Sequence, residues 1–520
     1  MTYSPDTAWP PTPEAIRTAH AEWSAWNRGS DALGAFYSGG SGASRVRPAQ
    51  LAGGIVGTLA RMWWGRPPQG DSQSRKRLHH PLASQIAERS ADVLFSRELS
   101  IEPQGDDKSL LKILDGNSWQ SLLPEVGKVA AASGGVYLRA GWDTDVADHV
   151  LIDYASADQA VPEFSYRKLR KVTFWRKVAE DGNRVWRHLE RHEPGRIVHR
   201  LYEGTDRTLG RLVPLQDRPE TEGLAALVTE DFIITGITHL TATYIPNVRP
   251  CARWADIPQG RALGQADIEP AIDLLDALDE DLNAERRDVR LGKARLMVAS
   301  TLLDDLGPGN GFAFDVDREV YEQVKFSQGQ NAGLGDLLHG EQFDMRTAEW
   351  LDKIKSRSSE IVNACGYSPQ TFGLPETAAT TATEVESREK RTAETRDRKS
   401  RFWTVGLEEF LRTCTALQSA QFSKGQEVEV KVSFPPYTLP TMKDAAQVVA
   451  VAGDAMSTRT KVELLHPDWD TDQVDAEVAE IKAGTPDPSV TVVDPFGRMG
   501  TTDQPDPAAV EDSPPAAPAA

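Results

Sequence analysis

The sequence predicts an α+β fold that is rich in helices and divided into several structural units. The chain has 520 residues, and at about 100–200 residues per domain this is too long for one core. Short segments rich in β-branched and aromatic residues follow one another between 134 and 204, which favours a sheet. Two long amphipathic helical patterns, 267–291 and 341–365, enclose a glycine-punctuated segment.

The composition excludes several classes of protein. With 58 Lys+Arg and 77 Asp+Glu the net charge is −19, and residues 441–520 alone contribute −10 of it. An acidic chain is a poor candidate for tight, sequence-independent binding to nucleic acid, although it suits nucleic acid that passes without sticking. No run approaches the roughly 18 apolar residues of a membrane span, and the first residues lack the pattern of a signal peptide. The three cysteines are too far apart for a zinc knuckle or a redox pair, which fits synthesis in a reducing cytoplasm.

The N-terminal part begins with a Trp-, Gly- and Pro-rich stretch, 1–75, in which we expect short helices joined by loops. Apolar spacing then predicts an amphipathic helix in 79–95, after Pro81, and a second helix over 118–132. The strands are predicted at 134–142, 149–156, 171–178, 184–192 and 196–204.

The helix predicted over 267–291 is acidic in its first half and basic at its end, which complements the helix dipole. The second helix is predicted from about Glu341 to Cys365. Between them lie short strands around a tight loop. We therefore expect an antiparallel helical hairpin with a small β-containing insert at its tip.

The longest predicted helix runs from 383 to 422 and follows a segment, 375–383, that is small and uncharged except for Glu376. Its first part is polar, with acid-first i,i+4 pairs that support a solvated helix. Its second part carries an apolar stripe made of Trp403, Leu407, Phe410, Cys414 and Leu417. A strand at 428–434 and three short helices at 442–455, 458–466 and 472–483 follow. The stretch from Gly484 onward has eight prolines in 37 residues and predicts a disordered tail.

Catalytic and cofactor motifs are not found in the sequence. It contains no GxxxxGK[ST], HExxH or GxSxG string. His79 and His80 are adjacent, so an ordinary loop is favoured over a metal site. Cys365 lies on the apolar stripe of its helix and is expected to be a buried structural thiol. The sequence thus predicts no catalytic residue, no metal site and no cofactor.

Two charged clusters admit a second interpretation. The acidic residues Asp276, Asp279, Glu280 and Asp281 could suggest a metal site, but a solvated helix surface is favoured. The stretch 166–177 interleaves Arg and Lys with aromatic residues, as some nucleic-acid-binding surfaces do. Because it also alternates, a sheet with one wet face is the favoured interpretation.

Several strings, in this order, resemble the portal proteins of tailed bacteriophages, the head-to-tail connectors of the siphophage type. They are HHPLASQIAERSADVLF (79–95), YASADQAVPEF (154–164), GYSPQTFGL (366–374) with TATEVESREKR (381–391), and STRTKVELLHPDW (457–469). No one string is diagnostic, and the resemblance covers roughly residues 20–485.

The resemblance implies a portal fold with named parts. The wing would comprise 1–263 and 367–440, with the long helix 383–422; the stem helices would be 264–292 and 341–366, and the clip 293–340. Residues 441–485 would form the crown, and 486–520 the tail without a counterpart. The tunnel loop, 375–383, would face DNA through Thr377, Ala378, Ala379, Thr380 and Thr381. Lys353, Lys355 and Arg357 of the second stem helix could line the channel.

The function implied by the resemblance is structural rather than enzymatic. Twelve copies would form a ring at one capsid vertex, assembled in the host cytoplasm and carried in the virion, through which double-stranded DNA is packaged and later ejected. The implied partners are the terminase large subunit, the major capsid protein or scaffold, and head-completion or adaptor proteins, with no membrane. Two alternatives stay open: a metal-dependent nuclease or hydrolase of α+β fold, which would use the scattered carboxylates, and another minor virion head protein.

Overall fold

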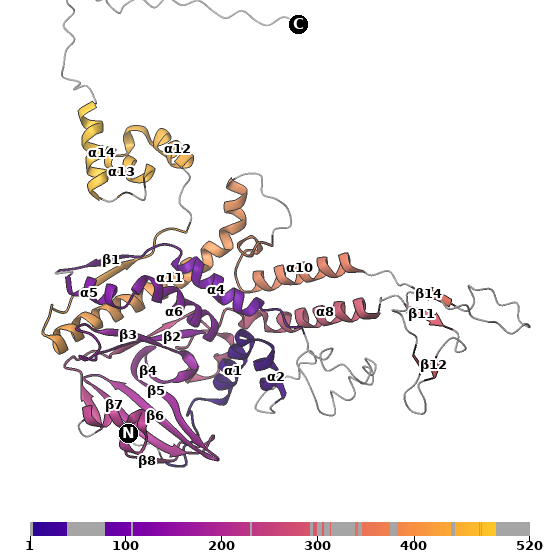
Figure 1. Cartoon of the computed structure of the whole chain (residues 1–520). Helices are drawn as coiled ribbons and strands as arrows, with labels where there is room; N and C mark the ends of the chain where they lie inside the picture. The colour runs from indigo at the N-terminus through magenta and orange to yellow at the C-terminus, as the bar shows by residue number, and fades with distance from the viewer. Residues whose placement is uncertain are drawn as a thin grey trace, which may run out of the picture. The chain divides into compact units, whose positions relative to one another are not determined.

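The computed structural model describes residues 4–38, 78–105, 108–228, 231–291, 295–298, 304–305, 312–313, 338–341, 346–374, 382–437, 442–466, 469 and 471–484. The chain divides into two compact units, 1–437 and 438–520. Helices and sheets both contribute to the first unit, so the predicted α+β class is confirmed (Figure 1). No helix within the described ranges is long and apolar enough to cross a membrane.

The N-terminal helices build one side of the first unit. They are α1 (Glu14–Arg28), α2 (Ser30–Ser38), α4 (Leu82–Phe95), α5 (Lys108–Gly116) and α6 (Trp119–Ser133). The helices predicted in 79–95 and 118–132 are therefore confirmed as α4 and α6. Both are amphipathic, and their buried faces include Ile86 and Leu94 in α4 and Leu123 and Val126 in α6.

Two antiparallel sheets carry the β-rich stretch. The smaller has the order β10-β2-β3, with β2 at Gly135–Gly141, β3 at Leu151–Ser156 and β10 at Ala242–Pro246. The larger has the order β4-β5-β6-β7-β8, with β9 also paired to β7. Its bounds are β4 (Ala160–Ser165), β5 (Lys168–Asp181), β6 (Arg184–Glu193), β7 (Arg196–Gly204), β8 (Arg211–Val213) and β9 (Phe232–Ile234). A short helix, α7 (Pro219–Leu227), lies between β8 and β9. Two of the hairpin turns place Gly182 and Gly195 at positive φ, where glycine is favoured.

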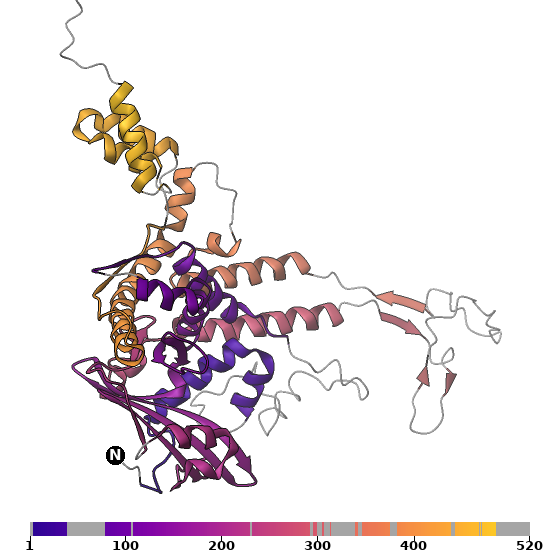
Figure 2. The ribbon, with the colours of Figure 1, turned by 60° about the vertical axis from the view of Figure 1, so that its left-hand side comes forward.

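The helical hairpin is formed by α8 (Ile272–Leu291) and α10 (Thr347–Ala364), which lie side by side (Figures 1 and 2). Between them come the antiparallel pairs β11 (Arg295–Val298) with β14 (Leu338–Glu341), and β12 (Asp304–Asp305) with β13 (Phe312–Ala313). Both helices start later than predicted. A 3-10 turn at Glu269–Ala271 precedes α8. The chain around Glu341 ends a strand, and α10 begins only where its apolar spacing begins, next to Ala348.

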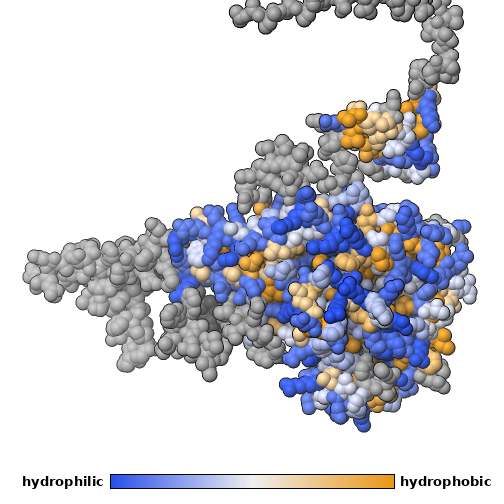
Figure 3. Space-filling view, turned by 180° about the vertical axis from the view of Figure 1, so that it is seen from behind, coloured by the Kyte–Doolittle hydropathy of each residue, from blue (hydrophilic) through white to orange (hydrophobic). Residues whose placement is uncertain are grey.

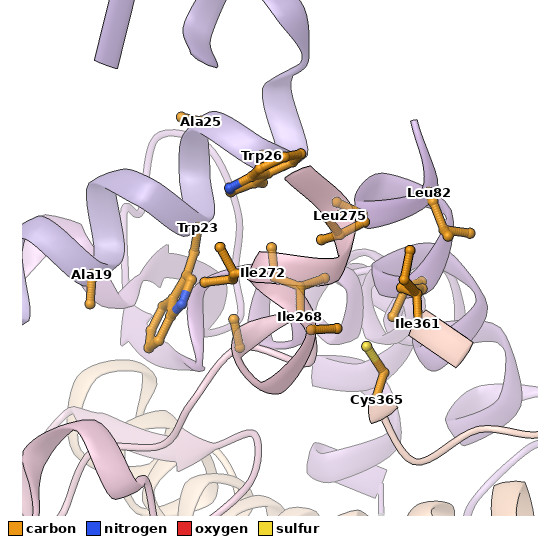
Figure 4. Close-up of a cluster of buried hydrophobic side chains, with 14 of the residues drawn as sticks. Ala19, Trp23, Ala25, Trp26, Leu82, Ile268, Ile272, Leu275, Ile361 and Cys365 are labelled. Atoms are coloured by element: carbon orange, nitrogen blue, oxygen red, sulfur yellow. The ribbon is translucent and has the colours of Figure 1, made fainter. Parts of the chain in front are cut away.

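The base of this hairpin is buried in a hydrophobic core. Trp23 and Trp26 of α1 lie near Ile272 and Leu275, while Ile361 of α10 lies on the other side of the cluster (Figure 4). These residues are almost completely inaccessible. Burial of such side chains is worth about 1.5–3 kcal/mol each, so the start of α8 and the end of α10 are firmly anchored.

Helix α11 (Ala382–Phe422) is the longest helix and supports a second core. Its predicted apolar stripe is confirmed, because Trp403, Leu407, Phe410, Cys414 and Leu417 are all buried. β15 (Val430–Ser433) follows α11 and pairs with β1 (Ser100–Pro103). On the face of the first unit seen in Figure 3, hydrophilic residues predominate, with scattered hydrophobic ones between them.

The second unit contains α12 (Met442–Ala452), α13 (Thr458–Leu465) and α14 (Thr471–Gly484), in agreement with the three predicted short helices. Ser457 caps α13: its hydroxyl accepts a hydrogen bond from the Thr460 amide at 3.2 Å. The predicted disordered tail lies outside the described residues.

Candidate functional site: the helical hairpin and its buried junction

The hairpin is held along its length by two groups of polar contacts centred on carboxylates of α8. Asp281 lies 2.6 Å from Lys353 Nζ and 3.3 Å from Arg357 Nε. Asp288 lies 3.4 Å from Arg346 and accepts a hydrogen bond from Trp350 Nε1 at 3.0 Å, which holds its pKa below the ordinary value. The carboxylates are seven residues apart, and so are Arg346 and Lys353. Because seven residues are close to two helical turns, the two antiparallel helices repeat one pairing motif.

A fully buried polar cluster lies at the base of the hairpin; we call it the Lys399 junction. The Lys399 ammonium lies 2.7 and 2.6 Å from the two oxygens of Asp267, and it donates to Ser90 Oγ at 2.7 Å and Tyr367 Oη at 2.9 Å. Asp267 also accepts from Tyr367 Oη at 2.9 Å and from Asn247 Nδ2 at 2.8 Å. Every proton of the ammonium therefore has an acceptor, as a buried charge requires.

The junction joins segments that are far apart in the chain. Asp267 precedes α8, Tyr367 follows α10, Ser90 lies on α4 and Lys399 on α11. Burial lowers the pKa of Lys399, and the neighbouring Asp267 opposes that shift. Burial raises the pKa of Tyr367, and Asp267 reinforces it. The cluster thus fixes both chain segments at the base of the hairpin, the one entering α8 and the one leaving α10, against the long helix.

The polar part of α11 has one solvated face and one packed face. Of the residues in the predicted i,i+4 pairs, those with a described side chain are exposed, as expected: Lys390, Glu394, Asp397, Arg398 and Arg401. The buried stripe on the other face was not expected. Thr392, Arg396 and Lys399 are buried and continue, at helical spacing, the stripe that begins with Trp403. The Thr392 hydroxyl accepts from the Ser368 amide at 2.9 Å, and Thr395 Oγ1 donates to the Gly366 carbonyl at 2.5 Å. These bonds dock the turn that follows α10 onto the start of α11.

The acidic cluster of α8 is largely buried, so the predicted solvated surface was wrong for Asp276, Asp279 and Asp281. Asp279 lies 2.8 Å from His79 Nδ1 and accepts from the His80 amide at 2.9 Å. Its carboxylate therefore anchors the segment before α4. Burial lowers the pKa of His80, with a smaller opposing effect from Asp279.

The predicted channel residues of α10 differ in their surroundings. Lys353 and Arg357 both contact Asp281, so they bind the two hairpin helices together. Lys355 is exposed, and no carboxylate of the described residues lies within ion-pair distance of it. Of the three, Lys355 alone presents its charge to solvent without such a contact in the described part of the chain.

The predicted tunnel-loop residues Thr377, Ala378, Ala379, Thr380 and Thr381 lie outside the described residues. The flanks of that segment are described: the turn Pro369–Phe372 on one side and α11 on the other, linked by a 2.8 Å contact between the Thr371 and Thr392 hydroxyls. Cys365 is buried, and burial raises the pKa of its thiol, as expected for a structural cysteine. Within the described ranges, no group of three or more His, Cys, Asp or Glu residues is arranged to hold a metal ion.

Sequence reasoning missed the Lys399 junction because its members are apart in sequence and polar. Asp267 and Lys399 are separated by 132 residues. One signal existed: Thr392, Arg396 and Lys399 occupy the positions that extend the apolar stripe of α11 toward its N-terminus. A lysine on such a stripe predicts a buried counter-ion, although not which carboxylate provides it.

Comparison with known proteins gives one family match. Residues 243–485 match the model of the family described as phage portal protein, SPP1 Gp6-like. The match includes α8, α10 and α11, and thus most of the Lys399 junction. Over these residues it agrees with the family that the sequence resembles.

Among solved structures, the chain is similar to one titled "Neck of empty GTA particle computed with C6 symmetry". The identity is 14%, the similarity covers 79% of this chain and 99% of that chain, and the TM-score is 0.35. A TM-score this low does not show a common fold. No curated protein sequence matches the chain.

Proposed function

Because the chain belongs to the tailed-phage portal family over residues 243–485, we propose that it forms the ring at a capsid vertex through which double-stranded DNA is packaged and ejected. The observation that carries the proposal is the helical hairpin inside the matched segment, anchored at its base by the Lys399 junction. Proteins of this family are structural, and the ATP hydrolysis that drives packaging would come from the terminase.

The parts of the portal fold are assigned by this proposal. Helices α8 and α10 are the stem, and the segment between them, which includes β11 to β14, is the clip that contacts the terminase large subunit and later the head-completion protein. The sheets with α11 form the wing, which would face the major capsid protein or scaffold. The helices of the second unit form the crown.

The charge of the chain suits a conduit. Twelve copies at −19 each carry −228 charges, so the ring as a whole repels DNA and discourages adhesive contacts that would stall translocation. Lys353 and Arg357 are partly neutralised by Asp281, whereas Lys355 is exposed. If the face of α10 that carries Lys355 lines the channel, the ring would offer DNA one weakly attractive circle of lysines, one from each copy.

The ring itself is tested by negative-stain imaging and mass measurement of the purified full chain. We expect closed rings with a central hole and a single subunit number. Monomers alone, across a wide range of protein and salt concentrations, would count against the proposed function.

The tunnel loop is tested by replacing Thr380 and Thr381 with arginine in the phage. We expect Thr380→Arg with Thr381→Arg to slow or arrest packaging without preventing ring assembly, because arginines bind the phosphate backbone. Thr380→Ser with Thr381→Ser is the matched control and should package normally. Unchanged packaging by the arginine variant would contradict the loop assignment.

A further inference from the structure

Two exposed features lie near opposite ends of strand β2. We call residues 165–170 the hairpin tip; they comprise the turn at Tyr166 and Arg167, the last residue of β4 and the first residues of β5. We call residues 142–149, between β2 and β3, the acidic loop. Near the tip, Phe164 packs against Tyr244 of β10, close to the Gly135 end of β2. The acidic loop continues from Gly141, at the other end. A strand of seven residues is about 23 Å long, so the two features do not meet within one subunit.

The hairpin tip has an unusual backbone. Its two central residues, Tyr166 and Arg167, have φ of +47° and +66°. Two-residue turns of this kind favour Asn and Gly, because larger side chains are strained at positive φ. Tyr166 is nevertheless 100% exposed, so its side chain gains no packing contact among the described residues that would offset the strain. A strained backbone that is not stabilised by contacts within the subunit indicates that the exposed side chain has a function.

The hairpin tip is also strongly basic. Arg167, Lys168 and Arg170 are exposed, and none of them lies within ion-pair distance of a carboxylate among the described residues. A fully exposed aromatic ring among free cations would suit an acidic surface with an apolar spot.

The acidic loop offers such a surface. Asp143 and Asp145 are exposed and have no ion pair with any described cation, and Val146 between them and Asp148 is 71% exposed. Beside the loop lies an open hollow of about 670 Å³, which is lined by Leu111 of α5, Gly116 and His149, by Asp115 and Asp148, and by Lys108 and Lys112. Asp148 pairs with Lys112 and Lys424, so the loop carboxylates that have no ion pair with a described cation are those of Asp143 and Asp145. Leu111 is itself half exposed. The acidic loop and the hollow therefore combine exposed apolar side chains, Val146 and Leu111, with two carboxylates that have no ion pair with a described cation, Asp143 and Asp145.

We propose that the hairpin tip of one copy docks on the acidic loop and adjoining hollow of a second copy. Tyr166 would pack against Val146 and Leu111, and the tip cations would face Asp143 and Asp145. The two surfaces differ: the hairpin tip belongs to the larger sheet and the acidic loop to the smaller one. The contact is therefore heterologous, and repeated contacts of this kind close into a ring when the rotation permits. The inference rests on the proposed ring and names one pair of surfaces that builds it.

A second copy fits the tip better than DNA does. DNA would satisfy the cations of the tip, but it would leave the exposed Val146 and the free carboxylates of the acidic loop without a partner. One contact between copies accounts for both features at once. A net charge of −19 also makes each copy an acidic partner.

The test is a charge-reversal exchange in the full chain, with the assembly midpoint measured by mass photometry over a protein dilution series. The tip variant is Arg167→Glu with Lys168→Glu, and the loop variant is Asp143→Lys with Asp145→Lys. Each should raise the midpoint concentration at least about tenfold, and the two combined should restore it to within about threefold, because opposite charges face each other again. Tyr166→Ser should weaken assembly without changing its salt dependence.

The control variant makes the same charge change as the tip variant at other exposed positions, Arg17→Glu with Arg401→Glu, and should assemble normally. Thermal unfolding of each variant shows whether it is folded. Failure of the combined variant to recover overturns the proposal. So does a tip variant that assembles normally but binds a short DNA duplex less well, which would make the tip a DNA contact.

The same experiment separates this inference from the proposed function. If the wild-type chain never assembles, the proposed function itself fails. If the wild-type chain assembles and every variant does too, only this inference fails.

Discussion

Ion pairs between a basic side chain and an aspartate occur both at the base of the helical hairpin and farther along it, but the first is buried and the basic partner of the second is exposed. At the base, Lys399 and Asp267 are each 2% exposed and share a complete set of hydrogen bonds. Farther along, Lys353 is 49% exposed beside Asp281, and Arg346 is 59% exposed beside Asp288. A fully buried pair is strongly destabilising to break, because the remaining charge stays buried without a partner. In the outer contact the Asp281 side chain is 9% exposed, but its partner Lys353 remains largely hydrated, so the contact is partly screened by solvent. The base is therefore a fixed joint, and the outer contacts only adjust the packing of two helices.

The largest loss of stability is expected at Lys399. Lys399→Met should lower the free energy of unfolding by about 3–5 kcal/mol, because Asp267 is left buried without its counter-ion. Urea unfolding followed by circular dichroism measures the loss. The control is Lys399→Met combined with Asp267→Asn, which removes both charges and should be clearly more stable than the single variant. Equal losses in the single and double variants would show that packing, not charge, holds the joint.

His188 is a buried titratable group that has no ion pair with a described carboxylate, in contrast to Lys399. Burial, followed by the adjacent His199, lowers the pKa of His188 to about 4 from the ordinary 6.5, although Glu190 opposes this and Arg176 and Arg139 add to it. Above pH 6.5 both folded and unfolded chains are neutral at this site. Below it the unfolded chain takes a proton first, so stability falls as the pH drops from about 6.5 to about 4, by at most about 3 kcal/mol for this site.

The check is the pH dependence of urea unfolding in the wild type and in His188→Gln. The variant removes one titrating group and should show a shallower fall over that pH range, whatever its stability at neutral pH. Parallel pH curves for the two proteins would mean that His188 does not titrate as its surroundings predict.

Sequence patterns predicted the helices and strands with regular apolar spacing, but they failed where polar or charged side chains are buried. The apolar stripes of α4 and α11 and the β-branched and aromatic residues of β5 to β7 are local signals, so they were sufficient. Asp279 and Asp281 were placed on a solvated surface because a hydropathy pattern treats every carboxylate as exposed. Their partners, His79 and Lys353, come from other segments, and no local pattern contains that information. The resemblance to portal proteins, by contrast, was visible in the order of several strings, and the family match over residues 243–485 agrees with it.

A smaller effect is expected in the outer part of the hairpin, at Asp281. Asp281→Asn keeps the size of the side chain but weakens its contacts with Lys353 and Arg357, which are both partly exposed. We expect a loss of about 1–2 kcal/mol in the free energy of unfolding. High salt should narrow the difference from the wild type, because screening already weakens these contacts. A loss as large as that of Lys399→Met would contradict the distinction between the two ends.

The smallest effect is expected at Lys355, which lies on the same helix but has no ion pair among the described residues. Lys355→Ala should change the free energy of unfolding by no more than about 0.5 kcal/mol, since a solvated lysine contributes little. Lys353→Ala is the matched comparison and should cost more, because it removes a contact with Asp281. If Lys355 faces the DNA channel, its replacement should alter packaging velocity while the stability stays unchanged. Altered stability with normal packaging would instead make Lys355 a structural residue of the hairpin, and the channel would have to be lined by another face.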